Sequence, residues 1–166
     1  MNAEELRAAQ APLKARYKAD PAAALVVLEG RGEAQADAQL CRVETFLGVT
    51  EAGLHPATGG DGKSACSGDM LLQALVACAG VTLGSVATAM GIALKGARIR
   101  AEGELDFRGT LGVSREAPVG FRRIVLHFEL DTDAPAESQA KLLELTERYC
   151  VVLQTLKHSP ELSRSP

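Results

Sequence analysis

The feature that most constrains this chain is a run of 25 consecutive residues, Met70–Leu94, without a single charged side chain. A helix that is apolar all round is typical either of a membrane span or of a protein core, and this run is long enough for both. Scattered hydroxyl and amide side chains inside the run, and the lack of interface anchors around it, favour the core. We therefore expect a buried helix and no membrane partner.

Such a helix needs cover on every side. Ala77, Gly80 and Gly84 form a stripe of small residues that allows close approach between helices. This stripe favours packing against the same helix of a second subunit, in a tight homodimer. The alternative is a monomer in which residues 2–18 and 136–157 cover the helix, and the sequence leaves it open.

Two later segments have the alternation of half-buried strands. Between residues 97 and 108 the odd positions are apolar or small and the even positions are charged, and residues 123–131 repeat the pattern. An apolar run at 24–28 predicts a further strand, with residues 40–47 as its hairpin partner across the turn Gly30–Gly32. Strands combined with a long apolar helix predict an α+β fold.

Helices are expected at both ends of the chain. Residues 2–18 have a helical composition, although Pro12 should kink or interrupt them. After Pro135, apolar side chains recur at helical spacing, which predicts a single helix as far as residue 157.

Length and charge exclude several classes of function. The chain has 166 residues, typical of one domain, and a net charge of −3 without a dense basic cluster. It also lacks tryptophan, so we expect no nucleic-acid partner. The first residues lack the basic and apolar stages of a secretory signal, which predicts a cytoplasmic location.

The cysteines are the candidate reactive groups. Cys41, Cys66, Cys78 and Cys150 show no Cys-x-x-Cys spacing, so a metal site has little support. In a reducing compartment, thiols that act together suggest redox chemistry. A lone buried cysteine is more often a small apolar core residue, and each of the four could be one.

Two segments around these cysteines resemble a known family. The stretch Ser67–Thr82, which contains Cys78 and follows Gly59–Gly62, resembles the first-cysteine helix of the OsmC/Ohr family of osmotically inducible and organic-hydroperoxide-resistance proteins. Glu147–Leu156, which contains Cys150, resembles its second-cysteine motif.

The resemblance implies three parts of the chain: an N-terminal helical extension at 1–20, an OsmC-like domain at 21–158 and a C-terminal tail at 159–166. It implies an OsmC/Ohr-like α+β fold, in which long central apolar helices are flanked by curved antiparallel sheets in an intertwined homodimer.

The resemblance further implies a thiol peroxidase for organic hydroperoxides that uses neither a metal nor a bound cofactor. Cys78 would attack the O–O bond and become a sulfenic acid, and Cys150 would then form a disulfide with it. An external dithiol, of the lipoyl type in this family, would restore the thiols. The rival interpretation is a non-catalytic dimer that binds an apolar small molecule and whose cysteines are structural.

Two further residues enter through the resemblance. The family activates its first cysteine with an arginine, for which Arg31 is the best positional match, and with an acidic residue, whose place Asp69 occupies. Arg31 could equally be a solvated turn residue. Nine residues at about 100° each put Asp69 on the opposite side of an ideal helix from Cys78, so we favour a role in capping the helix. Val151 stands where a proline commonly follows the second cysteine.

Overall fold

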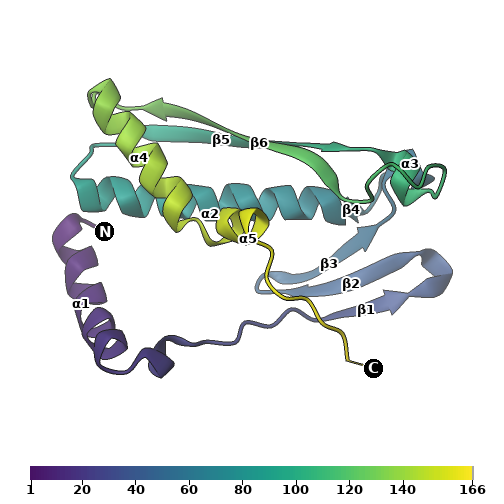
Figure 1. The fold of residues 1–166 in the computed structure, drawn as a ribbon, viewed down its shortest axis with the longest axis horizontal. Coiled ribbons are helices and arrows are strands. Elements are labelled where there is room, and N and C mark those ends of the chain that lie inside the picture. Colours follow the sequence, from purple (N-terminus) through teal and green to yellow (C-terminus); the bar gives the residue numbers. More distant parts are fainter. Residues whose placement is uncertain (166) are drawn as a thin grey trace. The chain divides into compact units, whose positions relative to one another are not determined.

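The computed structural model describes residues 1–165. Its main helices and strands are labelled in Figure 1. The helices are α1 (Ala3–Ala19), α2 (Ser67–Met90), α3 (Phe107–Thr110), α4 (Ala136–Tyr149) and α5 (Val151–Lys157). The strands are β1 (Gly32–Gln35), β2 (Leu40–Thr45), β3 (Gly48–Gly53), β4 (Ala65–Cys66), β5 (Gly96–Leu105) and β6 (Phe121–Asp131), and 3₁₀ turns occupy Pro21–Ala24, Ala36–Ala38 and Pro56–Thr58.

The chain forms two compact units, which we describe separately. The first unit consists of residues 1–26, 74–100 and 127–165, and the second of residues 27–73 and 101–126. The first unit therefore contains both Cys78 and Cys150.

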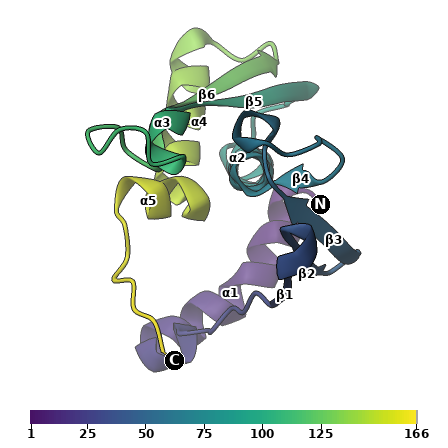
Figure 2. The ribbon, with the colours of Figure 1, turned by 90° about the vertical axis from the view of Figure 1, so that its right-hand side faces the viewer.

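The core of the first unit lies where α2, α4 and the β5–β6 pair meet. Apolar residues four positions apart form the buried face of α2: Leu75, Ala79, Leu83 and Ala87. Leu142 of α4, which is 0% exposed, joins Leu83 and Ala87 in one cluster. Strand residues with side chains on the inner face pack against this cluster: Ile99, Phe128 and Leu130. Figure 2 gives a second view of these elements around α2.

The opposite face of α2 is exposed in the single chain, and its burial against a second subunit stays a prediction. Ala77, Gly84 and Ser85 are exposed on this face, and Val81 is 73% exposed. The helix is long and apolar enough to cross a membrane, which is also true of the core helices of soluble proteins. Within residues 1–165 of a single copy, neither α1 nor the α4–α5 region covers this face.

The N-terminal helix begins with a capping box. Asn2 Oδ1 accepts hydrogen bonds from the peptide N–H groups of Glu4 and Glu5, each at 2.9 Å, and the Glu5 carboxylate accepts one from the Asn2 N–H. The helix continues through Pro12, so the expected interruption is absent.

The sheet of the second unit has the strand order β1-β2-β3-β4. The first three strands are antiparallel, and the short β4 runs parallel to β3. The predicted strand at 24–28 is wrong: Ala24 ends a 3₁₀ turn, residues 25–28 form no strand within the described residues 1–165, and Val27 is 94% exposed. The partner of β2 is β1 instead, because the chain reverses at Ala36–Ala38, where Gln39 adopts a left-handed conformation with φ 51°.

The two alternating segments form the expected strands β5 and β6, which pair with each other in a separate sheet. The single helix expected after Pro135 is divided into α4 and α5 by Cys150, whose backbone is extended, with φ −72° and ψ 105°. Residues 159–165 of the expected tail contain no helix or strand, and Pro166 lies outside the described residues.

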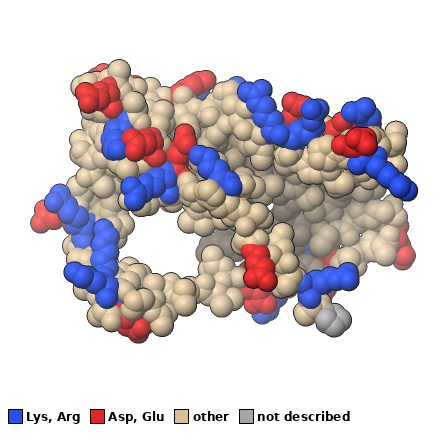
Figure 3. Space-filling model, viewed as in Figure 1, with Lys and Arg blue, Asp and Glu red and all other residues tan. Residues whose placement is uncertain are grey.

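Charged side chains of both signs are interspersed over the surface in Figure 3. Several of them form exposed ion pairs, such as that between Lys141 and Glu144 at 2.8 Å. Such pairs contribute little to stability, because water screens them.

Candidate functional site

The candidate site is the pair Cys78 and Cys150 in the first unit. Cys78 lies near the middle of α2 and is half-buried, and Cys150 lies at the junction of α4 and α5 and is 0% exposed. Both are free thiols, and a hydrogen bond joins their side chains. Figures 1 and 2 both place α5 beside α2. Two residues 72 positions apart in the sequence are thus neighbours.

The break between α4 and α5 follows from backbone hydrogen bonding at Cys150. The Cys150 N–H donates to the Thr146 carbonyl at 3.0 Å, which closes α4, and the Cys150 carbonyl accepts from the Gln154 N–H at 2.9 Å, which opens α5. The Gln154 side chain also donates to the Glu147 carbonyl at 2.7 Å, and Lys157 pairs with the Glu147 carboxylate at 3.1 Å. These contacts connect α5 to the last turn of α4.

This break frees two peptide groups next to the thiols. Val151 and Val152 are the first residues of α5, and N–H groups in the first turn of a helix have no partner inside that helix. Hydrogen bonding by both N–H groups lowers the pKa of Cys78. An anionic sulfur at this place is also favoured by the partial positive charge of the helix start.

The surroundings of Cys78 favour its thiolate. Burial by itself raises the pKa of Cys78. Hydrogen bonds from the Val152 N–H, from the Cys150 thiol and from the Val151 N–H act in the opposite direction, and the Thr82 hydroxyl adds a fourth. The four donors prevail, and the pKa of Cys78 lies below the ordinary thiol value.

The pKa of Cys150 is shifted in the opposite direction. Burial raises it, and the Leu153 N–H opposes this by hydrogen bonding to the sulfur. The adjacent Cys78 raises the pKa of Cys150 further, because two thiolates in contact repel each other. One thiol of the pair is therefore suited to be a nucleophile, and the other to remain protonated until the first has reacted.

The two other predicted site residues, Arg31 and Asp69, belong to the second unit. The Arg31 guanidinium forms two hydrogen bonds with Glu29, at 2.9 and 3.1 Å, and is exposed. Asp69 lies in the first turn of α2 and is exposed. Within residues 1–165, its carboxylate accepts no hydrogen bond from the helix backbone, so the capping role that we favoured is not observed.

The remaining thiols are half-buried in the second unit and are not placed for a disulfide with each other. Cys41 of β2 lies opposite Ala52 of β3, and Cys66 of β4 lies opposite Gly53, which also belongs to β3. Because β3 separates β2 from β4, the two backbones are about 10 Å apart, beyond the reach of a disulfide.

Sequence reasoning missed three donors to Cys78: the Thr82 hydroxyl and the N–H groups of Val151 and Val152. The sequence could have indicated the Thr82 hydroxyl, because residues four positions apart lie on the same face of a helix. It could not have indicated the two N–H groups, because these are available only if the helix ends at Cys150.

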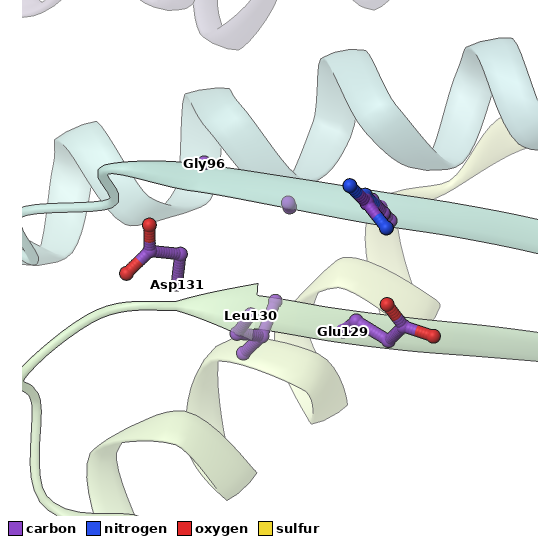
Figure 4. A pocket seen from close by; sticks show the side chains of 6 residues that line it. Gly96, Glu129, Leu130 and Asp131 are labelled. Carbon is purple, nitrogen blue, oxygen red and sulfur yellow. The ribbon is translucent and has the colours of Figure 1, made fainter.

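A cavity of about 440 Å³ lies at one end of the β5–β6 pair (Figure 4). It is lined by Gly96, Ala97, Arg98, Glu129, Leu130 and Asp131. Glu129 and Asp131 project on either side of Leu130 in Figure 4. Neither Cys78 nor Cys150 lines this cavity, and three of its six lining residues are charged.

Comparison with known proteins agrees with the family resemblance of the two cysteine segments. The family model described as OsmC-like protein matches residues 60–164. No protein with curated annotation matches the chain.

Solved structures show the same fold at low sequence identity. An OsmC-like protein from Mycoplasma pneumoniae is 16% identical with a TM-score of 0.67, over 81% of this chain and 89% of that one. The organic hydroperoxide resistance protein OsmC from Legionella pneumophila is also 16% identical, with a TM-score of 0.63 over 81% and 92% of the two chains. An organic hydroperoxide resistance protein from Elizabethkingia anophelis is 14% identical with a TM-score of 0.63, over 81% and 91%.

These similarities confirm the expected α+β fold of the OsmC/Ohr type. The matched segment contains Cys78 and Cys150 and more than half of the residues. The chain therefore belongs to the OsmC-like protein family.

Proposed function

We propose that the protein is a Cys-based hydroperoxide reductase that acts on organic hydroperoxides. The observation that carries the proposal is the contact between Cys78 and Cys150, in which the surroundings favour the thiolate of one and the protonated thiol of the other. Two solved relatives are named as organic hydroperoxide resistance proteins, which supports the choice of substrate class.

In the proposed first step, the Cys78 thiolate attacks the terminal oxygen of the hydroperoxide. The S–O bond forms while the O–O bond breaks, so that Cys78 becomes a sulfenic acid and an alkoxide leaves. The adjacent Cys150 thiol can give its proton to the alkoxide, which yields the alcohol. This transfer converts Cys150 into a thiolate when it is next needed as a nucleophile.

In the second step, the Cys150 thiolate attacks the sulfenic sulfur of Cys78. A disulfide forms, and the departing hydroxide takes a proton from the solvent to become water. An external dithiol then reduces the disulfide and is itself oxidised to a disulfide, which completes the cycle. We propose a small dithiol of the lipoyl type for this step, and a cytoplasmic location, where thiols are kept reduced.

Thiol counting tests the proposal against a non-catalytic apolar-ligand-binding protein. One equivalent of cumene hydroperoxide should remove two thiols per wild-type chain, and none in Cys78→Ser. Cys150→Ser should stop at the sulfenic acid, which dimedone traps. Cys41→Ser and Cys66→Ser are the matched controls, and both should behave as the wild type does. Failure of the reduced protein to consume the peroxide would refute the enzyme and leave the binding protein.

We also propose that the working form is a homodimer in which a second copy covers the exposed face of α2. This face is apolar and carries small residues, with Val81 73% exposed at its middle. The unpaired apolar segment Leu25–Leu28, whose side chains are 71–94% exposed, also needs a cover. Sedimentation equilibrium should give a dimer for the wild type and a monomer for Val81→Glu. A monomeric wild type would refute this part of the proposal.

A further inference from the structure

Thr82 lies one helical turn after Cys78, near the middle of α2. Side chains four residues apart on a helix lie on the same face, so the Thr82 hydroxyl can reach the sulfur of Cys78. Thr82 is half-buried, which limits competition from water for that hydroxyl.

Other threonines in helices use their hydroxyl groups differently. Thr88, Thr146 and Thr155 each donate to the backbone carbonyl four residues earlier, at 2.8, 2.8 and 2.9 Å. This bond is the usual one for a helical threonine. Within residues 1–165, Thr82 makes no bond of this kind, and hydrogen bonding by its hydroxyl instead lowers the pKa of Cys78. The Thr82 hydroxyl is thus directed toward the sulfur of the candidate nucleophile and not toward the backbone carbonyl four residues earlier.

We propose that Thr82 is a positioning residue, which donates its hydroxyl hydrogen to the Cys78 thiolate and holds that sulfur facing the start of α5. The hydroxyl approaches the sulfur from α2, whereas the Val151 and Val152 N–H groups approach it from α5. Donors from two helices thereby fix both the charge and the direction of the sulfur.

The hydroxyl also has an alternative partner in the same helix turn. When Cys78 is protonated or blocked, rotation of the Thr82 side chain can direct the hydroxyl toward the Cys78 carbonyl, as Thr88 does toward Gly84. The hydrogen bond between the Thr82 hydroxyl and the Cys78 thiolate can therefore form and break by side-chain rotation, without backbone movement.

The test measures ionisation of Cys78 directly. Iodoacetamide reacts with the thiolate, so the pH dependence of its reaction with the peptide containing Cys78, followed by mass spectrometry, gives the ionisation midpoint. The background is Cys41→Ser with Cys66→Ser, which removes the two thiols of the second unit. Thr82→Val removes the hydroxyl and keeps the branched shape, and should raise the midpoint by about 1 pH unit, as expected for loss of one hydrogen bond to a charged group.

Two further variants separate the proposed role from a packing effect. Thr82→Ser should return the midpoint to within a few tenths of a unit of the background value, because it restores the hydroxyl. Thr88→Val is the matched control on the same helix and should leave the midpoint unchanged. Equal midpoints in Thr82→Val and Thr88→Val, or no rescue by serine, would overturn the proposal. Should Thr82→Val fail to fold, the comparison of Thr82→Ala with Thr82→Ser decides in the same way.

The inference adds to the proposed peroxidase, but its measurement does not depend on peroxide. A raised midpoint in a protein that ignores peroxide would support the role of Thr82 and reject the enzyme. An unchanged midpoint in an active peroxidase would reject the role of Thr82 alone.

Discussion

Replacement of Val151 by proline gives the sharpest test of the donor arrangement at Cys78. Proline has no N–H, so Val151→Pro removes one of the hydrogen bonds to the sulfur. The position tolerates the ring, because it is the first residue of α5 and Val151 is 69% exposed. The preceding Cys150 already has the extended backbone that proline requires of its neighbour.

The size of the effect follows from the number of donors. A hydrogen bond to a charged group contributes about 1.5–3 kcal/mol, and one pKa unit corresponds to about 1.4 kcal/mol. Because several donors share the Cys78 thiolate, we expect the lower end of this range, a rise of about 1 unit in the pKa of Cys78. At a pH below that pKa, the thiolate fraction then falls about tenfold, while each thiolate becomes about threefold more nucleophilic. The net rate of alkylation should fall about threefold.

The assay is the pH dependence of iodoacetamide reaction at Cys78, in the background without Cys41 and Cys66. Val151→Ala is the control, because it shortens the same side chain and keeps the N–H. Circular dichroism and thermal unfolding verify that both variants keep the fold. If a folded Val151→Pro protein ionises at the same pH as Val151→Ala, the peptide N–H does not stabilise the thiolate and our explanation of the lowered pKa is wrong.

Three further predictions concern the fold. Leu142→Ala should lower the free energy of unfolding by about 2–5 kcal/mol in urea titrations, because Leu142 is 0% exposed in the main cluster. Gly103→Ala should lower the free energy of unfolding by about 1–3 kcal/mol in the same measurement, because its Cβ would clash with the Phe121 ring; an unchanged midpoint would contradict that packing. The Arg108 hydrogen bond lowers the pKa of Asp106 to about 2, so the carboxylate stabilises the fold above its ordinary pKa of 3.8, and this contribution is lost as the pH falls through 2. Acid unfolding of Asp106→Asn should therefore depend less steeply on pH between about 4 and about 2 than that of the wild type.

The parts of the fold that the sequence predicted are those with a strong local period. Strict alternation at 97–108 and 123–131 predicted β5 and β6 to within a few residues, and the uncharged run predicted α2. In both cases the pattern extends over a long, uninterrupted segment, so local sequence is sufficient to predict the element.

The errors concern features that depend on partners distant in the sequence. The apolar run at 24–28 has the composition of a strand, but strand formation needs a neighbour, and β2 pairs with the more polar β1. The helix break at Cys150 was missed for a related reason. Residues 136–157 keep a helical period throughout, and neither glycine nor proline marks the interruption.

The candidate site was predictable only as a list of residues. Cys78 and Cys150 were identified through the family resemblance, and their contact is a property of the fold. Thr82 could have been found from its spacing alone, whereas the N–H donors of α5 have no side-chain signature in the sequence.

The position of Cys150 between two helices has a mechanical consequence for the oxidised protein. A bond from Cys150 to Cys78 would tether the ends of α4 and α5 to the middle of α2 and close a loop of about 70 residues, which in the chain-entropy model stabilises the fold by about 4 kcal/mol. The oxidised chain would then resist unfolding more strongly than the reduced chain. Reduction of the disulfide would restore local opening.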